Sequence, residues 1–478
     1  MNRVLDKSAF AKFPHSGLAA VDQLMAGGRF AQALQLLIPV LRSDFDDATV
    51  LDRAAVCYFR VGDCQTALKL MELLLDVVPA NAAAWGKFAA MKASAGDRTG
   101  AAAAYRKALE LSPENVSFIA GLNLVQPVPV NSPHVSRLKA LAASATVSVA
   151  EQVLAHATLA RIEEKQGNFK LAFAHYKSAN ELKDADYDAE SVGTRVKDQA
   201  RFFEACRAAD AQADADASRM LFITGMPRSG TTLVESSLSR HPEICSIGES
   251  SALDKTAGAV RQYVAARGGG TGWWDWFGQL DEEAIRQFRA YFYQCAFQNE
   301  RPEGRVVLDK MPLNCFELGL AHVLLPDARF VFMSRHPLDT GLSNFKTNFH
   351  AGNGFSARLE WIGHITRSVL SSVQDYQSKL GSQLRIQSYE ALVSHPEEQI
   401  RALLAHAGLD WHEACLRPEE NEAAVNTASL LQVREKINTG ALGKWRRYQE
   451  ELEPLAGALG GSEWIGSWQA WDRQAAGA

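Results

Sequence analysis

The sequence has few cysteines, and they are not spaced as a structural metal site or a disulfide framework would require. The seven cysteines stand at positions 57, 64, 206, 245, 295, 315 and 415, and no two of them form a C-x-x-C pair. An odd number of scattered cysteines is typical of proteins that keep their thiols reduced. We therefore expect a cytoplasmic location.

Long apolar runs and a strong excess of one charge are also missing. No run reaches the ~18 apolar residues that a membrane-spanning helix needs, and the first residues lack the apolar core of a secretory signal. The 50 basic and 55 acidic residues leave a formal net charge of -5, which gives no whole-chain attraction to nucleic acid. No H-E-x-x-H motif or carboxylate cluster at ligand spacing occurs, so we expect no metal. Any anion site has to be a local cluster.

Small residues recur with a period of 34 in the first half of the chain. Glycines stand at positions 28, 62 and 96, and an alanine follows each of them five positions later. The same offset links Gly167 to Ala172. This is the period of tetratricopeptide repeats, in which a small residue lets two helices approach and a glycine makes the turn between them. A plain alanine-rich helical bundle is the alternative. Repeats of this kind expose a groove that commonly binds protein segments.

The pattern changes in the second half, where short apolar runs alternate with helix-like stretches. We expect a helical repeat region over residues 15–206, a polar and acidic linker over 207–219, and an α/β domain over 220–478. The apolar runs cover residues 220–224, 305–309, 329–334 and 384–389. Strands that alternate with helices predict a parallel sheet covered on both faces, so the fold class is α followed by α/β.

The strongest functional signal follows the first of these runs. A glycine-bounded loop starts at Gly225 and leads into a helical pattern, with side chains and backbone suited to an anion at Arg228, Ser229, Gly230, Thr231 and Thr232. The two glycines have the spacing of the P-loop motif G-x-x-x-x-G-K-[ST], but threonine replaces the lysine that reaches the β- and γ-phosphates. The loop therefore predicts a ligand with a phosphate-like group, but not the usual chemistry of a bound nucleoside triphosphate. A strand–turn–helix that binds nothing is the alternative.

A second candidate anion site follows the apolar run 329–334. Arg335 stands at the expected carboxyl end of that strand, where open α/β sheets bind ligands, and Ser343 follows eight residues later. A surface salt bridge of Arg335 is the alternative.

These two segments together resemble the sulfotransferases that use 3′-phosphoadenosine 5′-phosphosulfate (PAPS). The chain is most similar to the tyrosylprotein sulfotransferase-like branch, and to bacterial proteins with tetratricopeptide repeats before such a domain. The resemblance implies that residues 228–232, in GMPRSGTT, bind the 5′-phosphosulfate. It implies further that Arg335 and Ser343 bind the 3′-phosphate.

The resemblance also implies roles for residues elsewhere in the second half. Glu249 falls on the family's catalytic base, and Lys310 and Ser429 on residues that stabilise the leaving group. Tyr389 falls on a tyrosine near the adenosine, and Lys444 on a further lysine of the C-terminal segment. The tyrosylprotein enzymes carry two adjacent serines where leucine follows Ser429 here.

Some of these residues also have other interpretations. Glu249 could simply favour the start of a helix, Lys310 could be an exposed partner of Asp309, and His241 is an alternative base.

The resulting expectation is a PAPS-dependent sulfotransferase acting on a hydroxyl of a protein tyrosine or a glycan, rather than of a small metabolite. The repeats would bind the acceptor or a partner protein. The alternatives are a P-loop kinase-like enzyme and a non-catalytic repeat scaffold with a nucleotide-binding domain.

Overall fold

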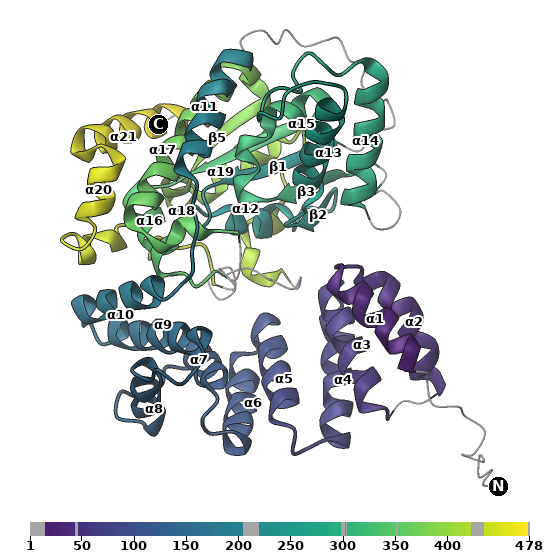
Figure 1. Cartoon of the computed structure of the whole chain (residues 1–478), viewed down its shortest axis with the longest axis vertical. Coiled ribbons are helices and arrows are strands. Elements are labelled where there is room, and N and C mark those ends of the chain that lie inside the picture. The colour runs from purple at the N-terminus through teal and green to yellow at the C-terminus, as the bar shows by residue number, and fades with distance from the viewer. Residues whose placement is uncertain are drawn as a thin grey trace. The chain divides into compact units, whose positions relative to one another are not determined.

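The computed structural model describes residues 15–43, 46–203, 219–297, 302, 304–349, 352–421 and 435–476 (Figure 1). Its elements form two compact units, and the chain passes from the first to the second between Gln166 and Gly167. The expected order, a helical region followed by a parallel-sheet domain, is confirmed. The predicted linker lies outside the described residues, except for Arg219, which begins the first strand.

The described part of the first unit is helical. Its helices are α1 (His15–Ala26), α2 (Phe30–Ser43), α3 (Ala48–Arg60), α4 (Cys64–Val77), α5 (Ala82–Ser94), α6 (Arg98–Leu111), α7 (Val116–Val125), α8 (Pro133–Ala142) and α9 (Val149–Lys165).

The residues that recur every 34 positions occupy equivalent places in this unit. Gly62 and Gly96 turn the chain after α3 and α5 with φ of 95° and 90°, a left-handed conformation that glycine adopts at low cost. The next residues, Asp63 and Asp97, cap the following helices by accepting a hydrogen bond from a backbone N–H. The alanines of the pattern are fully buried at Ala33, Ala67 and Ala101. The sequence period thus corresponds to repeated helix–turn–helix geometry.

The second unit contains the sheet and its covering helices. Its α-helices are α10 (Phe169–Glu181), α11 (Ala189–Phe203), α12 (Thr231–Leu238), α13 (Ala252–Ala266), α14 (Glu282–Ala296), α15 (Leu318–Leu324), α16 (Pro337–Lys346), α17 (Leu359–Leu380), α18 (Tyr389–Ser394), α19 (Pro396–His406), α20 (Glu453–Leu459) and α21 (Gly461–Ala476). Short 3₁₀ turns are η2 (Pro312–Phe316), η3 (Gly354–Ala357), η4 (Gly381–Gln383), η5 (Glu413–Leu416), η6 (Pro418–Glu420) and η7 (Lys444–Tyr448).

Five strands pair in the order β2-β3-β1-β4-β5, and all four pairings are parallel. They are β1 (Arg219–Gly225), β2 (Ile244–Gly248), β3 (Val306–Lys310), β4 (Arg329–Ser334) and β5 (Leu384–Ser388). Four of them coincide with the predicted apolar runs. The fifth, β2, was not predicted, because its sequence ICSIG has only five residues and is interrupted by a serine. Because all strands are parallel, their carboxyl ends share one edge of the sheet.

Alternating side chains of the central strand β1 build the core on both faces of the sheet. Leu221 and Ile223 belong to a buried cluster that includes Val234 of α12. On the other face, Phe222 stacks on Phe330 at 5.6 Å between ring centroids and contacts Phe292 of α14 at 6.2 Å. Apolar packing on both faces is what a parallel sheet requires, and it leaves the strand ends as the place for polar side chains.

Helix α10 packs on α16, the helix that follows β4. Phe173 stacks on Phe345 with ring centroids 5.2 Å apart, and the Asn180 amide donates a 2.8 Å hydrogen bond to the Phe345 carbonyl. This contact fixes the C-terminal part of α16, where Ser343 is located.

Candidate active site

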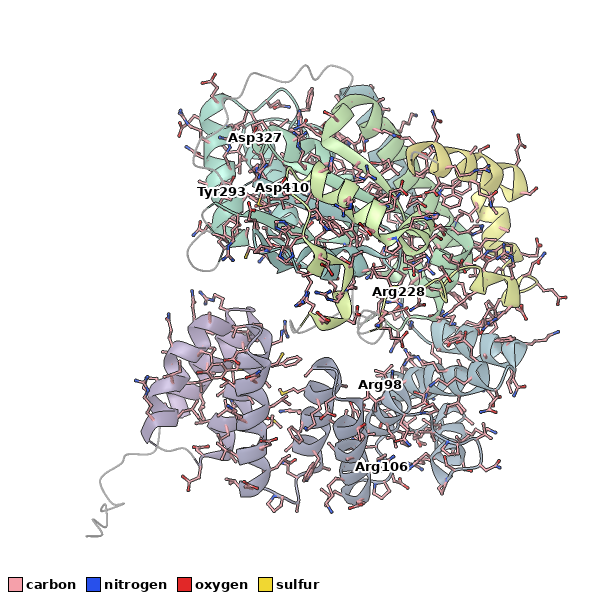
Figure 2. All side chains as sticks on the ribbon, turned by 180° about the vertical axis from the view of Figure 1, so that it is seen from behind. Arg98, Arg106, Arg228, Tyr293, Asp327 and Asp410 are labelled. Carbon is pink, nitrogen blue, oxygen red and sulfur yellow. The ribbon has the colours of Figure 1, made fainter. Side chains whose placement is uncertain are left out.

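The loop between β1 and α12 can be built only with glycine at both of its ends. A Cβ on Gly225, whose φ is 151°, would come within 2.7 Å of the Ser229 hydroxyl. A Cβ on Gly230, whose φ is 108°, would come within 2.5 Å of the Tyr389 ring. Arg228 (Figure 2) has a φ of 71° and is the only non-glycine residue with a positive φ in the described ranges. Strained backbone of this kind is concentrated at functional sites.

The same loop combines a buried hydroxyl with the start of a helix. The Ser229 side chain is buried, and its hydroxyl finds no hydrogen-bond partner within the described part of the chain. Helix α12 starts at Thr231, and its N-cap residue is Gly230, which has no side chain to cap the first N–H groups. An uncapped helix N-terminus and a buried hydroxyl that lacks a partner fit a bound anion such as a phosphate.

The second candidate anion site lies against this loop. Arg335, directly after β4, donates hydrogen bonds to the carbonyls of Arg228 (2.9 Å) and Ala441 (3.0 Å), and its guanidinium lies 4.4 Å from the Tyr389 ring centroid. Its Nε is buried and meets no acceptor among the residues described. Arg228 in turn donates from Nε to the Ser343 hydroxyl at 3.1 Å. Two arginines, a serine and a tyrosine are thus brought together from three separate segments.

A second cluster lies on the other side of β1. Lys310 ends β3 with a side chain only 1% exposed, and its ammonium contacts the Glu249 carboxylate and lies 3.5 Å from that of Glu235. The Ser246 hydroxyl donates a 2.9 Å hydrogen bond to Glu235. The interpretation of Lys310 as an exposed partner of Asp309 is therefore wrong, since Lys310 is buried and paired with two other carboxylates.

The two clusters share the carboxyl edge of the sheet, with the glycine-bounded loop between them. Lys310 is in register with Ile223 of β1, and Met333 of β4 is in register with Gly225. Lys310 is the last residue of β3, and Arg335 is the first residue after β4. Both therefore lie at the edge where β1, the strand between β3 and β4, enters the loop. Most of the residues predicted for the site meet there.

A buried carboxyl group adjoins the Lys310 cluster. Asp309 is fully buried, and its carboxylate oxygens make no hydrogen bond of normal geometry within the described ranges. Burial raises the pKa of Asp309 to about 8, against the smaller opposing effect of the Ser250 backbone amide, and the nearby Glu235 adds to the rise. Asp309 is therefore largely neutral at pH 7, so it contributes little charge beside Lys310.

The three remaining candidates are Ser429, Lys444 and the alternative base His241. Ser429 lies outside the described residues. Lys444 is exposed at the start of η7. His241 precedes β2 and so lies at the amino edge of the sheet, opposite Lys310, with its Nε2 3.1 Å from the Asp410 carbonyl. That position does not suit the alternative base.

Sequence reasoning missed Glu235 and the C-terminal helix α21. Glu235 comes four residues after Thr231, so it lies one turn further along the same face of α12; this spacing was the available signal. In α21, Asp472 is buried and accepts a 2.8 Å hydrogen bond from Ser388 at the end of β5. No motif connects so distant a segment with the strand ends.

Comparison with known proteins finds a family match within the second unit. Residues 221–413 match the model of the sulfotransferase family. The C-terminal half of the chain therefore contains a sulfotransferase family domain, and the matched range includes both clusters at the sheet edge.

The chain is also similar to individual proteins over about half of its length. An uncharacterized protein of Aquifex aeolicus is 32% identical over 243 residues, which are 50% of this chain and 32% of that protein. Protein-tyrosine sulfotransferase 1 of Danio rerio is 26% identical over 234 residues, covering 47% of this chain and 65% of its own length. The chain thus spans less than two thirds of either relative. Among solved structures, the sulfotransferase domain of the Synechococcus PCC 7002 olefin synthase aligns with a TM-score of 0.36 and 22% identity, over 50% of this chain and 90% of that domain.

Two further features concern the whole described chain. None of its described helices combines the length and apolar character needed to cross a membrane. No three His, Cys, Asp or Glu side chains converge as metal ligands in the ranges given above.

Proposed function

We propose that the protein is a sulfotransferase that moves a sulfuryl group from PAPS to a hydroxyl of a protein tyrosine or a glycan. The observation that carries the proposal is the convergence at one sheet edge of a glycine-capped loop, the cluster of Arg228, Arg335 and Ser343, and the Lys310–Glu249 pair. A loop for a 5′-phosphosulfate, a separate cationic site for a 3′-phosphate, and an acid–base pair are the parts that such a reaction needs.

The donor fits the side chains that are present. Residues 228–232 and the N-terminus of α12 would hold the 5′-phosphosulfate, and the Ser229 hydroxyl, which has no partner among the described residues, is a donor that needs an acceptor. Arg335 would hold the 3′-phosphate, because its buried Nε also lacks an acceptor among the described residues. Tyr389 would lie near the adenosine.

The reaction requires a proton acceptor and a stabiliser of the leaving group. The attacking hydroxyl oxygen forms a bond to sulfur while the bond from sulfur to the 5′-phosphate oxygen breaks. Glu249, the more exposed carboxylate beside Lys310, would take the hydroxyl proton. Lys310 would stabilise the negative charge that develops on the departing phosphate oxygen. Ser429 and Lys444 stay predictions for the same step and for nucleotide binding.

The helical unit favours a large acceptor, such as a polypeptide, over a small metabolite. Its 34-residue period, left-handed glycine turns and buried alanines support the proposal that it consists of tetratricopeptide repeats. Such repeats would bind the acceptor polypeptide or a partner protein.

Sulfuryl transfer from radiolabelled PAPS tests the function directly. We expect label on tyrosine-containing peptides or on a glycan panel, with one molecule of 3′-phosphoadenosine 5′-phosphate formed for each group transferred. Lys310→Met should lower the transfer rate by about 10²-fold or more, because the leaving group loses its cation. Magnesium-dependent consumption of ATP without use of PAPS would favour the kinase-like alternative. Binding of the bisphosphate without transfer to any acceptor would favour the scaffold.

A further inference from the structure

We propose that Glu235 is a positioning residue, which holds the ammonium of Lys310 in place and so leaves Glu249 free to change its charge as the base. This inference rests on the proposed function and assigns a different role to each of the two carboxylates. The starting observation is that one buried ammonium faces both of them.

The two carboxylates are held very differently. One Glu235 oxygen accepts a 2.9 Å hydrogen bond from Ser246 and the other lies 3.5 Å from the Lys310 ammonium, so both of its oxygens are engaged. The Glu235 side chain is 17% exposed, whereas that of Glu249 is 44% exposed. Glu249 follows Gly248, whose φ of 67° ends β2 in a turn. Glu235 is therefore the fixed partner, and Glu249 is the one that solvent or an acceptor can reach.

The need for a second carboxylate follows from the chemistry. A base that accepts a proton becomes neutral, so Glu249 ceases to be a counter-ion of Lys310 at the moment of transfer. A buried ammonium without a counter-ion is strongly unfavourable, and the side chain of Lys310 is almost completely buried. Asp309 does not compensate, because burial keeps its carboxyl largely neutral at pH 7. Among the described residues, Glu235 is the other carboxylate paired with Lys310, so it can serve as the counter-ion while Glu249 carries the proton.

The placement of Glu235 also connects the two halves of the site. It lies one turn after Thr231, on the helix whose N-terminus would hold the 5′-phosphosulfate. A single rigid helix therefore sets the position of the anion cradle and of Lys310 together. This arrangement keeps the lysine aligned with the oxygen on which charge develops.

A double-mutant cycle separates positioning from a merely structural role. We expect Glu235→Gln to lower kcat by about 10- to 100-fold, and to lower it less than about threefold in a Lys310→Met background, since its effect passes through Lys310. The affinity for 3′-phosphoadenosine 5′-phosphate, which lacks the sulfuryl group, should change by less than about threefold. Glu243→Gln, at an exposed glutamate before β2, is the matched control. Equal losses of kcat in both backgrounds, or loss of bisphosphate binding, would overturn the proposal.

A measurement without turnover keeps the inference testable if the proposed function fails. In protein labelled with ¹⁵N at lysine Nζ, a buried and paired ammonium exchanges its protons slowly and gives a resolvable signal, which Lys310→Met assigns. We expect this signal to persist in Glu249→Gln and to be lost in Glu235→Gln. Persistence in Glu235→Gln, or loss in Glu249→Gln alone, would show that Glu235 does not hold Lys310, whatever reaction the protein catalyses.

Discussion

The buried carboxyl of Asp309 predicts that part of the protein's stability decreases as the pH rises. Its pKa is about 8 in the folded protein, compared with 3.8 for an ordinary aspartate. Between these values the folded state binds a proton that the unfolded state has lost, so this group lowers the free energy of unfolding with increasing pH. The maximal slope is about 1.4 kcal/mol per pH unit. From about pH 5.5 to about pH 7.5 the loss is roughly 2.5 kcal/mol.

Asp309→Asn removes this titration while nearly preserving the shape of the side chain. We expect the variant to unfold close to the wild-type temperature at about pH 5.5, and roughly 5–10 °C above it at about pH 7.5, in the transition of the second unit. Thermal unfolding followed by calorimetry at both pH values measures the difference. Asp327→Asn, at an exposed carboxylate of the same unit (Figure 2), is the matched control and should show no such divergence. An equal shift of the Asp309 variant at both pH values would refute the reasoning, because Asp309 would then be ionised in the folded protein.

Two further predictions concern the backbone around the proposed nucleotide site. Gly230→Ala places a Cβ within 2.5 Å of the Tyr389 ring at a φ of 108°. We expect this variant to lose about 1–3 kcal/mol of stability and to bind the bisphosphate at least about tenfold more weakly, as measured by calorimetry. Unchanged binding would contradict the loop geometry. The Asp339 carboxylate accepts hydrogen bonds from the backbone N–H groups of Gly443 (2.7 Å) and Trp445 (2.9 Å). Asp339→Asn should therefore loosen this segment, so that trypsin cleaves faster at the two arginines after Trp445. An unchanged digestion rate would show that other contacts hold this segment.

Much of the fold follows from patterns that are local in the sequence. The runs at β1, β3, β4 and β5 are apolar enough to predict strands, and the glycine-bounded loop after β1 predicts the anion cradle. Strand β2 was not predicted because it has only five residues and is interrupted by a serine. Its pairing with β3, and not its own composition, makes this segment a strand.

The candidate site could be predicted where a motif marks its residues. Arg335 and Ser343 are separated by a spacing that can be read directly, and the structure brings both to the loop through Arg228. The spacing from Thr231 places Glu235 on one face of α12 but does not pair it with Lys310, and Asp309 has no mark at all, because their roles depend on which side chains the sheet order places around Lys310. That order, with β3 and β4 on either side of β1, is set by long-range pairing and not by any local pattern.

The most direct test of the account is calorimetric titration with 3′-phosphoadenosine 5′-phosphate, and with ATP plus magnesium for comparison. We predict saturable binding of the bisphosphate and much weaker binding of ATP. Arg335→Lys should weaken bisphosphate binding by roughly 10- to 100-fold, as expected for the loss of a charge-assisted contact. The same variant should bind adenosine 5′-phosphosulfate, which has no 3′-phosphate, like the wild type, and Ser343→Ala provides a second variant of the 3′-phosphate site. Binding of ATP alone, or bisphosphate affinity that is unchanged in both variants, would contradict the assignment of this sheet edge as a PAPS site.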